Sequence, residues 1–362
     1  MLIPSLTATQ GVIKPLVAIV AALLLGGVFM AISGVPPLMG YQALFRGAFG
    51  GPARIGVSIT KATPLILAGL GVALPLRCGL VNLGGEGQVY IGALTATLAA
   101  LGLRGLPWAV HLPMVVAAGF LGGALWGAIP GLLRARLKLN ELITSIMLGY
   151  VAFWVVSWLV HGPMKDPQGG GYPWSVQVPS SAILPFILSK YRINLGIVVA
   201  LVAAIVAHVL LWKTTFGFRM RAVGAGPLAA RLAGIRAERS IVWTFAVGGG
   251  LAGLAGMAEI MGVQFRLSDF FSPGYGWDAL VVALAGQSNP LGVVLIGLFF
   301  GALRNGAESA SRSIGMASSI SLIIQAWTLL FVVGSNSVVL MRTLRRRRRT
   351  RAGDAAQAVL LD

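Results

Sequence analysis

Apolar residues fill most of the chain, in long runs that short polar segments separate. Several runs reach or approach the roughly 20 residues that an α-helix needs to cross a bilayer. Their spacing predicts about ten crossings, near 15–33, 62–76, 84–101, 110–133, 141–161, 193–212, 241–262, 276–287, 290–306 and 318–340. We therefore expect an all-α polytopic membrane protein, with a single transmembrane domain over 1–362.

The second and eighth runs are short for simple spanning helices. Pro64 and Pro75 punctuate the second run, and Pro290 follows the eighth. Proline removes a backbone donor and kinks or ends a helix interior. We expect both segments to be broken or re-entrant, as happens where the backbone lies against protein or a wet cavity.

The distribution of charge predicts the orientation. The net charge is +18, and the basic residues gather at 134–138, within 213–240 and at 345–349. Basic loops stay on the cytoplasmic face, and the parity of crossings then places both termini inside and 162–192 outside. Basic segments beside apolar spans point to a bacterial cytoplasmic (inner) membrane, with a basic tail over 342–362 near anionic lipid. They argue against a nucleic-acid partner.

The residues for covalent or metal chemistry are sparse. Only 10% of the 362 residues are charged and 57% are apolar, whereas about a quarter are charged in soluble domains. Cys78 is the single cysteine and the three histidines are far apart. We expect no metal site, no cofactor and no catalytic set, so the chain is not expected to be an enzyme.

Glycine is frequent, at 49 residues, and recurs at helical spacing within apolar runs. Small residues let membrane helices approach closely. We expect close helix packing at three ladders, formed by Gly123, Gly127 and Gly131, by Gly249 and Gly253, and by Gly297 and Gly301.

Two halves of the chain, about 62–161 and 241–340, are similar in layout. The stretch GGEGQVYIGA (84–93) resembles GYGWDALVVA (274–283), because each has glycines, an acid and then an apolar run. Crossing parity makes the halves antiparallel. An inverted repeat of this kind is a recurrent transporter architecture, with the pathway near interrupted helices at the repeat interface.

Both matching stretches carry polar side chains inside an apolar sequence. The candidates for a substrate pathway are Asn82, Glu86, Gln88, Tyr275, Trp277 and Asp278. The alternative for both acids is structural, since the helix dipole favours carboxylates at a helix N-terminus. Parity places Glu86 near the inner end of its helix and Asp278 near the outer end of its own. Glu308 and Arg312 are four residues apart and are expected to pair on one helix face.

The segment 214–235 is too polar to span the membrane. Its glycines and the Gly226–Pro227 pair are turn signals, and AARLAG ends in a glycine that resembles a helix C-cap. The pattern predicts a turn–helix–turn element that docks on a cytoplasmic partner. A short amphipathic helix on the inner membrane surface is the alternative.

These segments together resemble one known family. GFRMRAVG (217–224) and AARLAGI (229–235) resemble the coupling loop of ATP-binding cassette importer permeases, in the branch for simple sugars, nucleosides and branched-chain amino acids. VNLGGEGQVYIGA (81–93) and the stretch 274–307 resemble elements of its nucleoside-type members. The resemblance covers both halves of the chain.

The resemblance implies a permease subunit that works with cassette ATPases, a second permease subunit (the same chain or another) and an extracytoplasmic substrate-binding protein. The chain contains no G-x-x-x-x-G-K-[ST] phosphate loop, so ATP is expected on the partner subunits. The loop over 213–240 would contact the ATPase, through Gly217, Arg219, Arg221, Gly224, Pro227, Arg231 and Gly234.

The expected function is import of nucleosides or related sugar-containing solutes. A ribose-type sugar permease of the same family is an alternative. An ion-coupled secondary transporter is a second alternative, which the loop over 214–235 disfavours.

Overall fold

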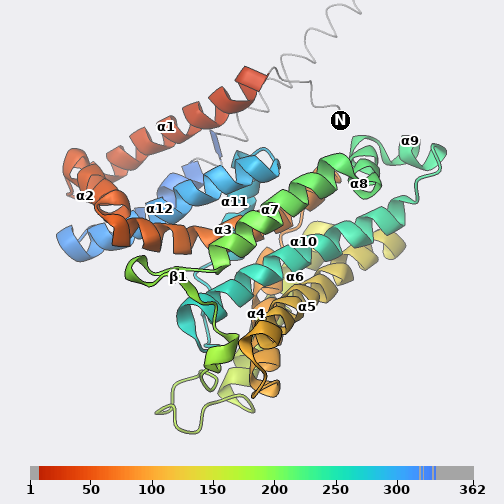
Figure 1. Cartoon of the computed structure of the whole chain (residues 1–362). Coiled ribbons are helices and arrows are strands. Elements are labelled where there is room, and N and C mark those ends of the chain that lie inside the picture. The colour runs from red at the N-terminus through yellow and green to blue at the C-terminus, as the bar shows by residue number, and fades with distance from the viewer. Residues whose placement is uncertain (1–7, 318, 321, 328–329, 332–362) are drawn as a thin grey trace, which may run out of the picture.

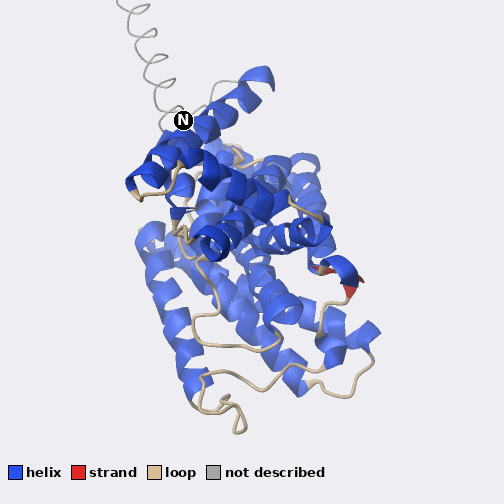
Figure 2. Cartoon of the chain, turned by 90° about the vertical axis from the view of Figure 1, so that its left-hand side faces the viewer, coloured by secondary structure: helices blue, strands red, loops and turns tan. Residues whose placement is uncertain are grey.

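The computed structural model describes residues 8–317, 319–320, 322–327 and 330–331. Helices make up most of this part of the chain (Figures 1 and 2). The α-helices are α1 (Ala8–Ile32), α2 (Pro37–Phe49), α3 (Pro52–Arg77), α4 (Gly85–Gly102), α5 (Trp108–Leu137), α6 (Glu141–His161), α7 (Gly196–Lys213), α8 (Thr215–Ala225), α9 (Pro227–Leu232), α10 (Ala237–Glu259), α11 (Tyr275–Ala285) and α12 (Pro290–Ile314). A π-helical turn, Ile260–Gln264, extends α10.

The strands and 3-10 turns lie between α6 and α7. Two short strands, β1 (Phe186–Leu188) and β2 (Ile193–Asn194), pair antiparallel. Single 3-10 turns cover Ser180–Ala182 and Ser189–Tyr191. In Figure 1 this loop region lies at the opposite end of the molecule from α8 and α9.

Six of the described helices are long and apolar enough to cross a membrane. They are α3, α5, α6, α7, α12 and the extended α10, Ala237–Gln264. The pair Ile19–Ile32 and Pro37–Phe49, bent by 117°, adds a seventh if it counts as one span. The chain is therefore a polytopic helical membrane protein. The runs at 84–101 and 276–287 form helices, α4 and α11, that are not among the six, and α11 has only 11 residues.

One expectation about breaks is corrected. The second run does not break, because α3 continues for 26 residues with Pro64 and Pro75 inside it. Its most apolar window is 78% buried, so packing against neighbouring helices stabilises the helix where the proline donors are missing. The bend falls instead at Pro36 and Pro37, where the chain turns from α1 into α2, a helix that the apolar pattern did not predict.

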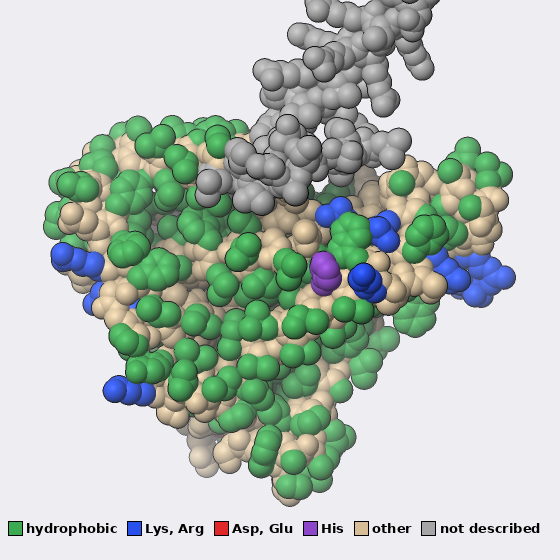
Figure 3. Space-filling model, turned by 45° about the horizontal axis from the view of Figure 1, so that its top comes forward, with side chains coloured by type: hydrophobic (Ala, Val, Ile, Leu, Met, Phe, Trp, Pro, Cys, Tyr) green, Lys and Arg blue, Asp and Glu red, His purple; other side chains and the backbone are tan. Residues whose placement is uncertain are grey.

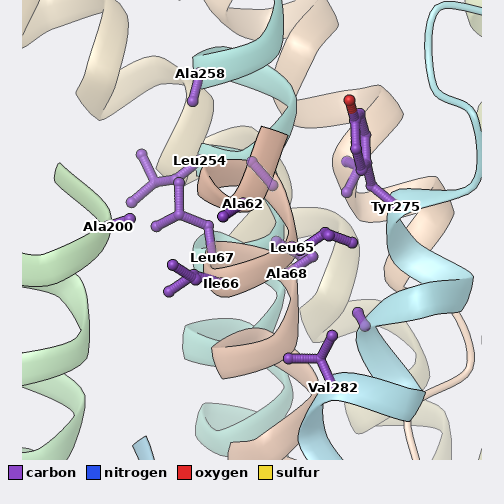
Figure 4. Packing of buried hydrophobic residues seen from close by; sticks show 14 of the residues in the cluster. Ala62, Leu65, Ile66, Leu67, Ala68, Ala200, Leu254, Ala258, Tyr275 and Val282 are labelled. Atoms are coloured by element: carbon purple, nitrogen blue, oxygen red, sulfur yellow. The ribbon is translucent and has the colours of Figure 1, made fainter. Parts of the chain in front are cut away.

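The core forms around α3 and α10, which pack against each other. α3 also contacts α7, α11 and α12, while α10 also contacts α4 and α5. In Figure 4 the labelled side chains of α3 lie between Ala200 of α7, Leu254 of α10 and Val282 of α11. These two helices therefore connect the first half of the chain with the second.

The predicted glycine ladders are confirmed as sites of close helix approach. Any Cβ on Gly123 or Gly127 of α5 would collide with the backbone of α10 at Gly249 and Gly253. Gly301 of α12 meets the backbone of α3 at Ala62 in the same way. Small residues therefore allow α5 to pack closely on α10, and α12 to pack closely on α3.

Parts of the predicted C-terminal region lie outside the described residues. The described part of the run at 318–340 is 319–320, 322–327 and 330–331. The basic tail over 342–362 lies wholly outside it.

Candidate functional site

The first turns of α4 and α11 meet inside the helix bundle. The backbone N–H of Gly276 donates to Glu86 Oε2 at 2.6 Å. The two helix starts approach so closely that a Cβ on Gly276 would collide with the backbone of Glu86. Two helix N-termini therefore face each other, and the carboxylates of Glu86 and Asp278 lie where two positive helix ends converge.

Both acids lie in the first turn of their helices, and the structure brings these two helix ends together, which the sequence did not predict. α4 begins only after the non-helical segment 78–84, which carries the chain back from the end of α3. α11 is 11 residues long, or about 16 Å at 1.5 Å per residue. Its first turn therefore lies well within the depth that its neighbour α3 spans, beside the start of α4.

Asn82 and Gln88 pair with each other. Asn82 Nδ2 donates to Gln88 Oε1 at 2.9 Å, and Asn82 Oδ1 accepts from the backbone N–H of Gly84 at 3.0 Å. Both side chains are 1% exposed. The two buried amides satisfy each other's hydrogen-bonding groups. Asn82 also accepts from Gly84, so the pair stabilises the turn before α4.

An arginine that the sequence interpretation passed over organises the start of α11. Arg304 Nη2 of α12 donates to the carbonyl of Pro273 at 2.8 Å, and Nη1 lies 3.7 Å from Asp278 Oδ2. Its guanidinium lies 5.0 Å from the ring centroid of Tyr275. Asp278 and Tyr275 are both buried. A basic residue within an apolar run is the signal that could have identified Arg304.

Further polar contacts join the end of α10, α3 and α12. Gln264 Nε2 donates to Glu259 Oε1 and to the carbonyl of Phe271, at 2.9 Å in both cases. Lys61 Nζ of α3 forms an ion pair with Glu308 Oε1 of α12 at 2.7 Å. The predicted pairing of Glu308 with Arg312 is therefore replaced by a pairing between helices.

Exposure separates the six pathway candidates. Trp277 is 44% exposed, and Glu86 is half-buried. The other four, Asn82, Gln88, Tyr275 and Asp278, are buried. Trp277 and Glu86 are thus the two candidates that present surface.

The loop over 162–184 pairs with the segment that leads into α11, which the sequence did not predict. Ser175 donates its backbone N–H to Leu267 at 2.7 Å, and Val178 donates to Phe265 at 3.0 Å. Arg266 and Asp166 form an ion pair at 2.8 Å. Residues 162–184 therefore hold the segment at 265–267, which leads into α11.

The predicted turn–helix–turn at 214–235 is present as α8 and α9. Thr214 Oγ1 caps α8 by accepting from the N–H of Gly217 at 3.1 Å. Pro227 occupies the first turn of α9, and Gly234 follows it with a left-handed φ of 79°. These are standard helix start and stop features.

Gly224 fits α8 directly against the end of α3. A Cβ on Gly224 would meet the carbonyl of Arg77 and the backbone of Cys78. Gly217 likewise lies against carbonyls of α7 at Leu210 and Leu211. Both glycines therefore seat α8 on two spanning helices.

The three arginines of this segment differ in their surroundings. Arg231 pairs with Glu238, and the Arg221 guanidinium lies 4.5 Å from the ring centroid of Trp212. Arg219 is exposed. In Figure 3, Lys and Arg side chains lie toward both the right-hand and the left-hand edges of a face whose middle is largely apolar.

Exposed apolar side chains also lie on these two short helices. Phe218 is 60% exposed, Leu228 72% and Leu232 84%. Leu228 and Leu232 are four residues apart and so lie on one face of α9. A protein partner would bury such side chains.

Comparison with known proteins gives a consistent assignment. Residues 55–333 match the family described as branched-chain amino acid transport system / permease component. The glucose ABC transporter permease protein TsgB13 of Haloferax volcanii is 37% identical over 331 residues, covering 89% of this chain and 87% of that protein. The guanosine ABC transporter permease protein NupP of Bacillus subtilis is 35% identical, covering 90% and 93%. The nucleoside ABC transporter permease protein NupB of Lactococcus lactis subsp. cremoris is 32% identical, covering 90% and 91%.

These relatives are transport components rather than enzymes, and their similarity extends over both halves of the chain, the meeting of α4 and α11, and α8–α9. The chain therefore belongs to the branched-chain amino acid transport system permease family and is a multi-pass permease subunit of an ATP-driven importer.

Proposed function

We propose that α8 and α9 form the seat of the cassette ATPase. The observation that carries this proposal is the pair of exposed leucines on α9, with Phe218 on α8, on helices that Gly224 fixes against α3. ATP is held by the partner subunit, and nucleotide-driven movement reaches the spanning helices through α8. This placement makes the α8–α9 end cytoplasmic and 162–184 external, and we retain from crossing parity the proposal that both termini are inside.

The substrate pathway runs beside the meeting point of α4 and α11. Trp277 supplies an aromatic face for a base or sugar ring, and Glu86 supplies hydrogen-bond acceptors. The Lys61–Glu308 pair, with side chains 24% and 38% exposed, lies on α3 and α12 toward the outer side. The buried residues beneath this surface support it: Asn82, Gln88, Tyr275 and Asp278.

The two halves form an inverted repeat around this point. α5 lines α10 as α12 lines α3, and α4 packs on α10 as α11 packs on α3. In this arrangement α4 and α11 are the corresponding interrupted helices, and the pathway lies where they meet. The ten crossings include α4 and α11 as partial spans.

Nucleosides are the proposed substrates, because relatives named for guanosine and nucleoside transport match nine tenths of the chain. A simple sugar is the second candidate, favoured by the similarity to a glucose permease. An extracytoplasmic binding protein delivers the substrate to the external loops. A second permease subunit, either this chain again or a related one, completes the channel.

Changing Leu228 and Leu232 together to serine tests the seat of the ATPase. We expect the affinity of the double variant for the ATPase to fall about a hundredfold or more, and co-purification with it, since two exposed leucines together contribute about 3 kcal/mol or more when buried. Leu188→Ser, which changes a half-exposed leucine of β1 in the outer loop, should leave ATPase binding intact. Undiminished co-purification of the double variant would assign α9 to the membrane surface instead.

A further inference from the structure

Arg77, the last residue of α3, holds the turn between α11 and α12. Its Nε donates to the carbonyl of Ser288 at 2.9 Å, and its Nη2 donates to the carbonyl of Gln287 at 2.8 Å. Hydrogen bonds from a charged donor are stronger than neutral ones, and a guanidinium makes two of them in a fixed geometry. These two hydrogen bonds therefore join the end of α3 to the α11–α12 turn, so that the two segments would move together.

The turn that Arg77 holds has an unusual backbone. Gln287 and Ser288 both have left-handed φ values, 55° and 51°, in a region that residues with side chains seldom occupy. Such conformations persist where the surroundings fix them. The carbonyls of these two residues are those that accept from Arg77. The arginine therefore stabilises the conformation that sets the direction of α11.

Arg77 also contacts α7 and packs against α8. Its guanidinium lies 5.5 Å from the ring centroid of Trp212 at the end of α7, and the Arg221 guanidinium of α8 lies 4.5 Å from the same centroid. The backbone of Arg77 is in turn the surface against which Gly224 packs. A displacement of α8 therefore bears on Arg77 through two contacts.

We propose that Arg77 is the positioning residue that transmits movement of α8 to α11. Movement of α8 shifts the end of α3 and the Trp212 stack, and the two hydrogen bonds carry that shift to the α11–α12 turn. α11 then moves Trp277 and Asp278 relative to Glu86. The inference rests on the proposed ATPase seat, and it adds the link between that seat and the pathway.

The test uses the assembled importer, with permease, ATPase and binding protein reconstituted in lipid vesicles. Arg77→Lys keeps the charge but cannot make the two-pronged contact. Substrate uptake per ATP hydrolysed should fall about tenfold or more, because two charge-assisted hydrogen bonds are disrupted. ATPase co-purification should stay at the wild-type level. Arg136→Ala, at an exposed arginine near the cytoplasmic end of α5, is the control and should keep the wild-type ratio.

A second readout follows movement directly. Hydrogen exchange of the peptide over 275–289 should change on trapping the wild-type complex with ATP and vanadate, and this change should be lost in Arg77→Lys. Arg77→Lys with wild-type coupling and a wild-type exchange response would overturn the inference.

Trp212 offers a variant that leaves the turn untouched. Trp212→Leu removes the stacking face and should lower uptake per ATP, while Trp212→Phe retains a face and should restore most of it. If Arg77→Lys does not assemble, an unchanged ratio in Trp212→Leu overturns the proposal. Failure of the wild-type chain to bind any ATPase would instead refute the proposed seat.

Discussion

Glu86 shows how one side chain can serve two helices. It lies in the first turn of α4 and accepts from the first turn of α11, so a single carboxylate neutralises two positive helix ends. A charge inside the bilayer is tolerated when it faces the bundle interior with partners. Its structural role and its proposed place beside the pathway are therefore compatible.

Replacing Glu86 separates these roles. Glu86→Ala leaves the Gly276 N–H without its acceptor, and we expect a loss of about 1–3 kcal/mol in the free energy of unfolding. Glu86→Gln keeps an acceptor and should retain most of the folded protein. Detergent-extracted, monodisperse protein and uptake per molecule are scored separately. If Glu86→Ala gave wild-type levels of folded protein but no uptake, substrate contact would be its main role.

Cys78 provides a natural probe at the seat of α8. It is buried in a cluster with Val223 of α8 and Ala230 of α9, and burial raises the pKa of its thiol from 9.0 to about 11. The thiolate is the reactive form, so at pH 7 the folded protein holds the neutral thiol.

The rate of maleimide labelling should therefore keep rising about tenfold per pH unit up to pH 10, beyond the point where an ordinary thiol levels off. Mass spectrometry of the intact chain measures the rate, with the denatured chain as the reference. A plateau near pH 9 in the folded protein would show that Cys78 is exposed.

At the scale of elements, the contact between α8 and α3 depends on the absence of a side chain. Gly224→Leu places atoms against the carbonyl of Arg77, so α8 must shift. Because the spanning helices do not depend on this contact, we expect normal membrane insertion but uptake reduced at least about tenfold, a shift worth about 1.4 kcal/mol or more.

Gly226→Ala is the matched control two residues away. A Cβ there would have ordinary room, with its nearest neighbour at 3.7 Å, and its φ of −176° suits any residue. Uptake and hydrolysis should both stay near wild type. Full transport by Gly224→Leu would contradict the role given to this contact.

The apolar pattern predicted most spanning helices because length and hydropathy decide membrane insertion. α6 and α7 begin and end within a few residues of their predicted limits. The extra length of α3 was hidden, since its first turns hold Arg54, Ser58 and Lys61 and read as a loop. These residues find partners on other helices, Lys61 with Glu308 and Ser58 with Asn305, which no local pattern reveals.

The candidate site could be predicted in part. The motifs identified both acidic first turns, but their meeting depends on how far the segment 78–84 carries the chain back into the bundle. A basic residue within an apolar run was the available signal for Arg304, but the partners of Arg77 and Arg304 could not be predicted, because each donates to a carbonyl far along the chain, at Ser288 and Pro273. A contact to a distant backbone carbonyl produces no motif or regular spacing in the sequence, so it cannot be predicted from it.

At the scale of the whole molecule, α11 is tied at both ends. The segment before it is paired with the loop over 162–184, and the turn after it is held by Arg77. Both of these regions therefore contact the segments that flank the same short helix. Because coupling travels through elements with discrete arrangements, we propose that movement of α11 links delivery of substrate to hydrolysis of ATP.

Uptake of labelled guanosine into vesicles that hold the reconstituted importer tests the central claim most directly, with labelled glucose measured in parallel. The account predicts accumulation that requires the binding protein, the ATPase and ATP, and that persists when ion gradients are collapsed. Accumulation driven by an ion gradient without ATPase, or ATP-independent uptake by the chain alone, would contradict it.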